Sequence, residues 1–190
     1  MNTKNLPEGY KEYAKIDFVN SKKDAIIINV IALIVAIMLI GLTDVPFKTV
    51  IPKGGFSPVM IKIVLLLVAL FVYIILHEAF HGIAIGLISK NKPHFGFKST
   101  YAYTGSDMYF DRLSYILIAL APISILGILL TIILFSVPIE WYWFVYIPVI
   151  LNFAGSAGDL YVTGLTLHMP KDALIHDEGV AMTIFSKVEE

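Results

Sequence analysis

Two histidines and a glutamate lie close together inside a long apolar segment, VYIILHEAFHGIAIGLI, at residues 72–88. His77 and His81 are four positions apart, so on a helix both imidazoles lie on one face and can bind one metal ion. Glu78 lies beside them, where its carboxylate can take a proton from an attacking water molecule. This spacing indicates zinc-assisted hydrolysis, with His77 and His81 as metal ligands and Glu78 as the catalytic base.

The apolar surroundings strengthen this interpretation. An ionisable residue inside lipid costs about 2.5 kcal/mol or more, so three of them within five positions need a partner that compensates them. A bound metal ion is such a partner. The chain has no cysteine, so thiolate ligands and disulfides are excluded and the remaining ligands must be His, Asp or Glu. We therefore expect Zn²⁺ as the cofactor.

Composition indicates that most of the chain is surrounded by a lipid bilayer. Of its 190 residues 57% are hydrophobic, and the mean hydropathy is +0.79, which excludes an ordinary soluble domain. The predicted fold class is an all-α membrane protein with about four transmembrane helices, at 25–42, 59–89, 113–137 and 141–167. The net charge of −1 without a basic stripe argues against a nucleic-acid partner.

The segments outside the apolar runs are polar. Residues 1–24 are expected to form a cytosolic tail, with a helix at the membrane surface as one possibility, and residues 168–190 a cytosolic tail that lies on the membrane or packs on the segment 94–104. In that segment aromatic residues alternate with smaller ones, a period of two that predicts a small cytosolic β-hairpin between spans two and three. The remainder, 25–167, is then one membrane-embedded domain.

The distribution of lysine and arginine predicts the orientation. With both termini in the cytosol, 11 of the 14 basic residues lie on the cytosolic side and only Lys48, Lys53 and Lys62 lie outside. The second and fourth spans then run in the same direction. His81 and Asp159 lie about 7 and about 8 residues before the cytosolic ends of these spans, which places them at similar depth at about 1.5 Å per residue.

Asp159 is the only carboxylate within the fourth span. Opposite His77 and His81 it can be a third metal ligand, which leaves the fourth position for water as a catalytic zinc site requires. The alternative is a hydrogen bond between helices. Asn152 can bind a substrate backbone or simply join helices, and the small residues at 155–158 allow either a close approach to the second span or a local unwinding beside a cavity.

Three further histidines, His94, His168 and His176, lie in polar segments. None has the helical spacing at which two imidazoles converge on one ion. We therefore interpret each as a surface or capping residue rather than a ligand.

The motif HEAFHG in an apolar helix, followed by a polar hairpin region and later by N-x-x-G-S-x-x-G-D, resembles the zincin peptidases of bacterial membranes and, more distantly, the site-2 proteases. The resemblance covers about residues 59–165. It implies cleavage of transmembrane or juxtamembrane protein segments near the cytosolic face. In site-2 proteases a proline lies between the asparagine and the metal-binding aspartate, and glycine follows that aspartate. Here no proline lies between Asn152 and Asp159, and Leu160 follows Asp159. This departure weakens the assignment of Asn152 as a substrate-binding residue.

Three functions are compatible with the sequence. The first is a zinc-dependent intramembrane endopeptidase, favoured because Glu78 is needed only if water must be activated. The second is a non-catalytic zincin-like membrane scaffold whose metal is structural. The third is a metal transporter, disfavoured because the sequence lacks the internal repeats and multiple broken helices typical of transporters. The sequence indicates neither the substrate nor the oligomeric state.

Overall fold

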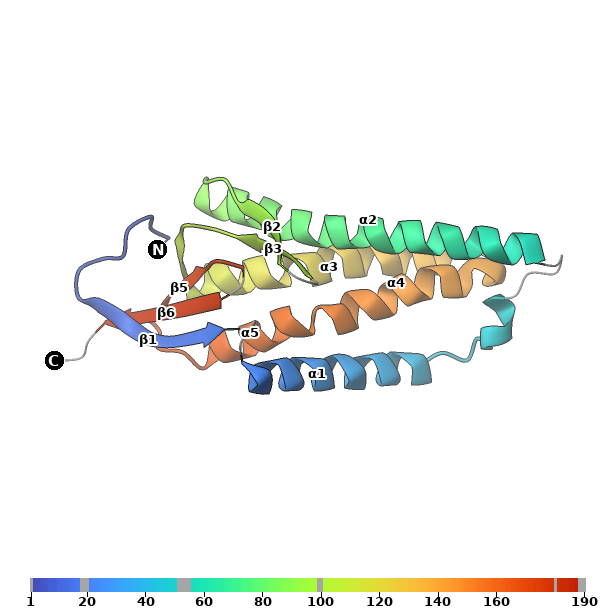
Figure 1. Ribbon diagram of the computed structural model, residues 1–190, viewed down its shortest axis with the longest axis horizontal. Coiled ribbons are helices and arrows are strands. Elements are labelled where there is room, and N and C mark those ends of the chain that lie inside the picture. The colour runs from blue at the N-terminus through green and yellow to red at the C-terminus, as the bar shows by residue number, and fades with distance from the viewer. Residues whose placement is uncertain (1, 18–20, 51–55, 99–100, 180, 188–190) are drawn as a thin grey trace.

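The protein is built on a bundle of long helices with a small β-sheet at one end (Figure 1). Its structure, a computed structural model, describes residues 2–17, 21–50, 56–98, 101–179 and 181–187. The helices are α1 (Lys22–Gly41), α2 (Phe56–Ser89), α3 (Arg112–Ser136), α4 (Tyr142–Gly155) and α5 (Ala157–Leu167), with short 3₁₀ turns η1 (Phe47–Val50) and η2 (Ile139–Trp141). Residues 51–55, which include Lys53 of the predicted outer segment, lie outside the described part.

Within the described part of the chain, four helical segments are long and apolar enough to cross a membrane, at Lys22–Gly41, Pro58–Ser89, Arg112–Ser136 and Ile139–Leu167. Helix is the conformation such runs require in lipid, because it satisfies every backbone N–H and C=O internally. The prediction of four apolar helices is confirmed, and the chain has the composition of a multi-pass membrane protein. The second helix and the last one, α5, both run toward the end that carries the sheet (Figure 1).

The fourth apolar segment is broken in two at Ser156, which separates α4 from α5. The break falls within the run Gly155, Ser156, Ala157 and Gly158, where glycine lowers helix stability. Of the two alternatives left open for this run, local unwinding is therefore what the structure contains. The break gives α5 its own N-terminus and places Asp159 in its first turn, where the helix dipole favours a negative charge.

The chain is mostly helical as predicted, but it is not all-α, because segments before α1, before α3 and after α5 form a β-sheet. The strands β1 (Tyr10–Asp17), β4 (Tyr109–Asp111), β5 (Leu174–Asp177) and β6 (Ala181–Lys187) form a sheet in the order β1-β6-β5-β4, with all neighbours antiparallel. β1 replaces the surface helix considered for the N-terminal tail. The sheet forms because alternate residues of β6, Met182 and Ile184, are fully buried against the helices.

A second, two-stranded sheet lies beside α2. Its strands β2 (His94–Lys98) and β3 (Tyr101–Gly105) pair antiparallel, in the segment where the aromatic alternation predicted a hairpin. Gly82 of α2 leaves no room for a side chain because the Phe95 ring lies against it. On the other side, the Tyr103 ring lies against Gly179, so the hairpin is held between α2 and the turn that follows β5.

The sheet covers the end of the helices that carries the motif. One buried cluster joins it to α2, α3 and α5; its members include Ile85, Phe110, Tyr115, Ile118, Val162, Ile175 and Met182. A second cluster around Trp143, Tyr146 and Val149 packs the opposite end of the bundle. Because β1 pairs with β6, the first and last described strands lie at the same end of the bundle (Figure 1).

Candidate metal centre

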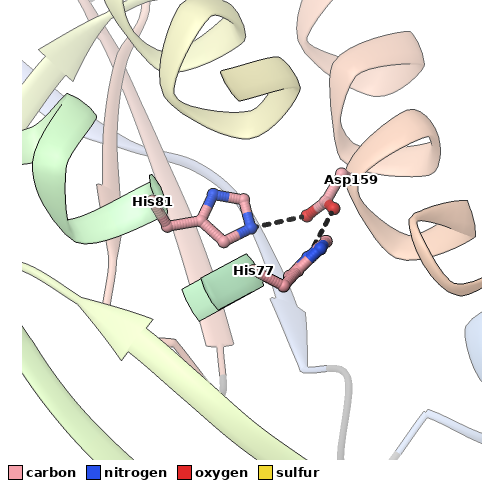
Figure 2. Close-up of side chains that lie close together, drawn as sticks. All are labelled: His77, His81 and Asp159. Atoms are coloured by element: carbon pink, nitrogen blue, oxygen red, sulfur yellow. Dashed lines mark ion pairs between the residues drawn. The ribbon is translucent and has the colours of Figure 1, made fainter. Parts of the chain in front are cut away.

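Three of the predicted site residues converge at the contact between α2 and α5 (Figure 2). His77 Nε2 lies 3.3 Å from Asp159 Oδ2, and His81 Nε2 lies 3.3 Å from Asp159 Oδ1. The three side chains are only 14%, 13% and 20% exposed, so they are largely shielded and still open to a small ion. The structure thus places His81 and Asp159 side by side, as expected if they lie at similar depth in two parallel helices.

The outer nitrogen of each ring has its own partner. His81 Nδ1 lies 3.0 Å from the Ile118 carbonyl of α3. His77 Nδ1 lies 3.3 Å from the Tyr73 hydroxyl, which donates to the Leu151 carbonyl of α4 and can therefore accept from the imidazole. In the neutral form of each ring these partners favour a proton on Nδ1 and a lone pair on Nε2 that faces Asp159, the arrangement of metal-binding histidines.

The donor set fits zinc. The candidate ligand atoms of His77, His81 and Asp159 all lie within 4.8 Å of one another, and they are nitrogens and carboxylate oxygens, the ligands zinc takes where thiolates are absent. Bonds of about 2.0–2.2 Å in a tetrahedron separate ligand atoms by about 3.3–3.6 Å. In the structure each Nε2 lies 3.3 Å from a different Asp159 oxygen, and the three candidate ligand atoms lie within 4.8 Å of one another, so the side chains must move closer together to enclose one ion.

Glu78 lies beside this group and accepts hydrogen bonds from a residue of the hairpin. The Thr104 hydroxyl of β3 lies 2.8 Å from Glu78 Oε2 and 3.0 Å from the Glu78 backbone carbonyl. Its single proton can therefore orient the carboxylate, which keeps Glu78 at the rim of the metal group rather than within it. The sequence did not indicate Thr104, because nothing in the strand pattern distinguishes it from a packing residue.

The site opens into a cavity of about 510 Å³, a volume typical of ligand-binding sites. Its walls come from α1, α2, α3, α5, the hairpin and the turn after β5; they include Asn29, Glu78, Ala102, Thr104, Tyr115 and Asp177. The Tyr115 hydroxyl donates to Asp177 Oδ2 at 2.5 Å, and burial raises the pKa of the Asp177 carboxyl. Asp177 could not be found from the sequence, because it lies in a strand that only the folded sheet brings to the site.

The other candidates lie apart from the metal group. Asn152 is fully buried and donates from Nδ2 to the Ile123 carbonyl at 3.1 Å; it is not among the described residues that line the cavity. This favours the helix-joining alternative over substrate binding. His94 lies 3.1 Å from Asp107 Oδ1, His168 Nδ1 lies 2.8 Å from the Gly164 carbonyl, and His176 stacks on Tyr109.

Two imidazoles from one helix, a carboxylate from a second helix and a glutamate beside them form the kind of site that zinc metallopeptidases use. Residues 70–174, more than half of the chain, match the model of a family described as "Putative zincin peptidase", and the chain belongs to this family. The predicted family is thereby confirmed, and membership implies zinc as the metal. No curated protein and no solved structure shows a significant match to the chain.

Proposed function

We propose that the protein is a zinc-dependent intramembrane endopeptidase that hydrolyses peptide bonds of transmembrane or juxtamembrane substrates near the cytosolic face. The observation that carries the proposal is the convergence of His77, His81 and Asp159 beside Glu78, at a cavity between apolar helices. A structural metal would need the three ligands but not the glutamate. Glu78 therefore favours the hydrolase over the scaffold.

Each residue has a defined task in this proposal. His77, His81 and Asp159 would hold Zn²⁺, which when bound supplies a Lewis acid and lowers the pKa of a bound water to about 7. Glu78 takes the proton of the attacking water and passes it to the leaving amine. Thr104 fixes the Glu78 carboxylate during this transfer. Helices α1 and α2 offer the apolar walls along which a membrane-embedded substrate would reach the cavity.

The proposal is tested by metal analysis of the purified protein together with cleavage of a model transmembrane peptide. We expect about one zinc per chain and hydrolysis that stops when a chelator removes the metal and resumes when zinc is returned. Zinc without hydrolysis of any membrane-embedded substrate would favour the scaffold. Absence of bound metal would contradict both.

The hairpin is the candidate for holding the substrate. Strand β3 lines the cavity and pairs with β2 on one side, so its other edge can accept an extended peptide as an added strand. Such pairing would also unwind a helical substrate and expose its carbonyls. In an antiparallel pair, two directly opposite residues point their N–H groups either toward each other or, both of them, away from the partner strand and outward. Proline at an outward position removes a donor without breaking the hairpin.

A proline scan of residues 95–103 tests this role. Where proline replaces a β3 residue whose N–H points away from β2, we expect kcat/KM to fall about 10- to 100-fold with zinc content unchanged, because the scissile bond is no longer held in place. The opposite pair Phe97 and Ala102 provides a matched control, since only Ala102 lines the cavity. Peptide cleavage and bound zinc are measured for each variant. Unchanged cleavage throughout the scan would remove the hairpin from the mechanism.

The membrane topology can be tested independently of activity. From the distribution of basic residues we propose four spans with both termini in the cytosol, and the pairing of β1 with β6 supports termini at one end. Reporter fusions after Lys53 and at the C-terminus are expected to report opposite sides of the membrane. The same side for both would contradict this topology.

A further inference from the structure

A proline interrupts the hydrogen bonding of α3 next to the metal group. In an α-helix the carbonyl of each residue accepts from the N–H four positions further on. Pro122 lies inside α3, is fully buried and has no N–H. It therefore cannot engage the carbonyl four positions earlier, which is that of Ile118.

That carbonyl is the partner of a candidate metal ligand. His81 Nδ1 lies 3.0 Å from the Ile118 oxygen, and a carbonyl oxygen only accepts, so Nδ1 carries the imidazole proton. In the neutral ring the opposite nitrogen, Nε2, then keeps its lone pair, and it faces Asp159 at 3.3 Å. A helix with an ordinary residue at position 122 would offer its own N–H to the same oxygen and compete with the histidine.

We infer that Pro122 is a positioning residue for His81: by leaving the Ile118 carbonyl free, it fixes the orientation and tautomer of the ring that binds the metal. The inference rests on the proposed metal site. The two histidines differ in what holds their outer nitrogens. His77 is held by a side chain, Tyr73, whereas His81 is held by the backbone of a neighbouring helix. The hydrogen bond to the outer nitrogen of a ligand histidine commonly changes metal affinity 10- to 100-fold.

The test compares Pro122→Ala with Pro148→Ala. Alanine fits either position, restores an N–H and favours helix. Pro148 is buried inside α4 in the same way, and the carbonyl it leaves free is that of Phe144, whose ring packs on Trp141 away from the metal group. Zinc affinity of the full chain in detergent is measured by competition with a chelator, and the visible spectrum of the cobalt-substituted protein reports ligand geometry.

We expect Pro122→Ala to weaken zinc binding about 10- to 100-fold and to shift the cobalt spectrum, while Pro148→Ala changes neither. A Pro122 variant with the affinity and spectrum of the unmodified protein would overturn the positioning role and leave the proposed enzyme intact. Equal effects of both variants would also overturn it, since they would reflect general changes of helix packing. Failure of the unmodified protein to bind zinc would instead contradict the proposed function.

A second variant tests the role of the Ile118 carbonyl if Pro122→Ala does not fold. Replacing Ala119 by lactic acid turns the Ile118 carbonyl into an ester carbonyl, a weaker acceptor, while Pro122 stays in place. Replacing Leu129 by the α-hydroxy acid with the leucine side chain weakens the Ile128 carbonyl, about 15 Å further along α3 at 1.5 Å per residue. We expect zinc binding to weaken only for the exchange at Ala119, and equal affinity in both would overturn the inference.

Discussion

Glu78→Gln is expected to leave zinc binding unchanged and to lower the hydrolysis of a model transmembrane peptide by about 10²- to 10⁴-fold, the contribution of a general base. Glutamine keeps the size of the side chain and an oxygen that the Thr104 hydroxyl can still reach. It cannot accept the proton of the attacking water. Zinc content should not change, because Glu78 lies outside the group formed by His77, His81 and Asp159.

The Glu78 variant separates the proposed enzyme from the scaffold. A matched exchange, Glu140→Gln, removes a carboxylate from η2 at the other end of the bundle and should leave both zinc and hydrolysis as they are. Zinc content is measured by elemental analysis and turnover on the same preparation. A Glu78→Gln protein that cleaves at the normal rate would show that no proton acceptor is needed there, and the hydrolytic role would fail.

Asp159→Asn is expected to weaken zinc binding by more than the 10- to 100-fold typical of an outer hydrogen-bond partner, and to lower activity in parallel. Asparagine preserves the shape of the side chain but removes the charge that lies 3.3 Å from both Nε2 atoms. A metal ion held by two neutral imidazoles alone lacks the third ligand of a catalytic zinc site. The dissociation constant is measured by chelator competition.

Asp177→Asn is the matched control for zinc binding, because Asp177 lines the same cavity without belonging to the three-residue group. Its zinc affinity should match that of the unmodified protein. If Asp159→Asn kept full zinc and full activity, the third ligand would have to be sought among His94, His168 and His176. The contact between α2 and α5 would then lose its proposed function.

The three candidate metal ligands could be predicted from the sequence because the signal for each lies within a single helical segment. Helical spacing alone places His77 and His81 on one face, and counting residues from the ends of two parallel spans gives the depth of Asp159. Both arguments need only the length of a helix and the thickness of a membrane. The four apolar helices follow from the same considerations.

The sheet could not be predicted in the same way, because its strands are defined by partners far away in the chain. β1 pairs with β6, so Tyr10 lies opposite Lys187. Taken alone, β1 is a short polar segment without a buried face, and strand formation depends on neighbours rather than on intrinsic preference. The site residues Thr104 and Asp177 were missed for this reason: each reaches the cavity through strand pairing, which no spacing rule within one segment contains.

The pairing of β1 with β6 also fixes an order of assembly during synthesis. Among the described elements β1 precedes α1 and its partner β6 follows α5, so β1 cannot join the sheet until all five helices have been synthesised. Asp177, the last residue of β5, and Gly179, which contacts Tyr103 from the turn after β5, complete the cavity wall only once this part of the chain has been made. A nascent chain therefore contains the helix that carries His77 and His81 long before it contains the complete cavity.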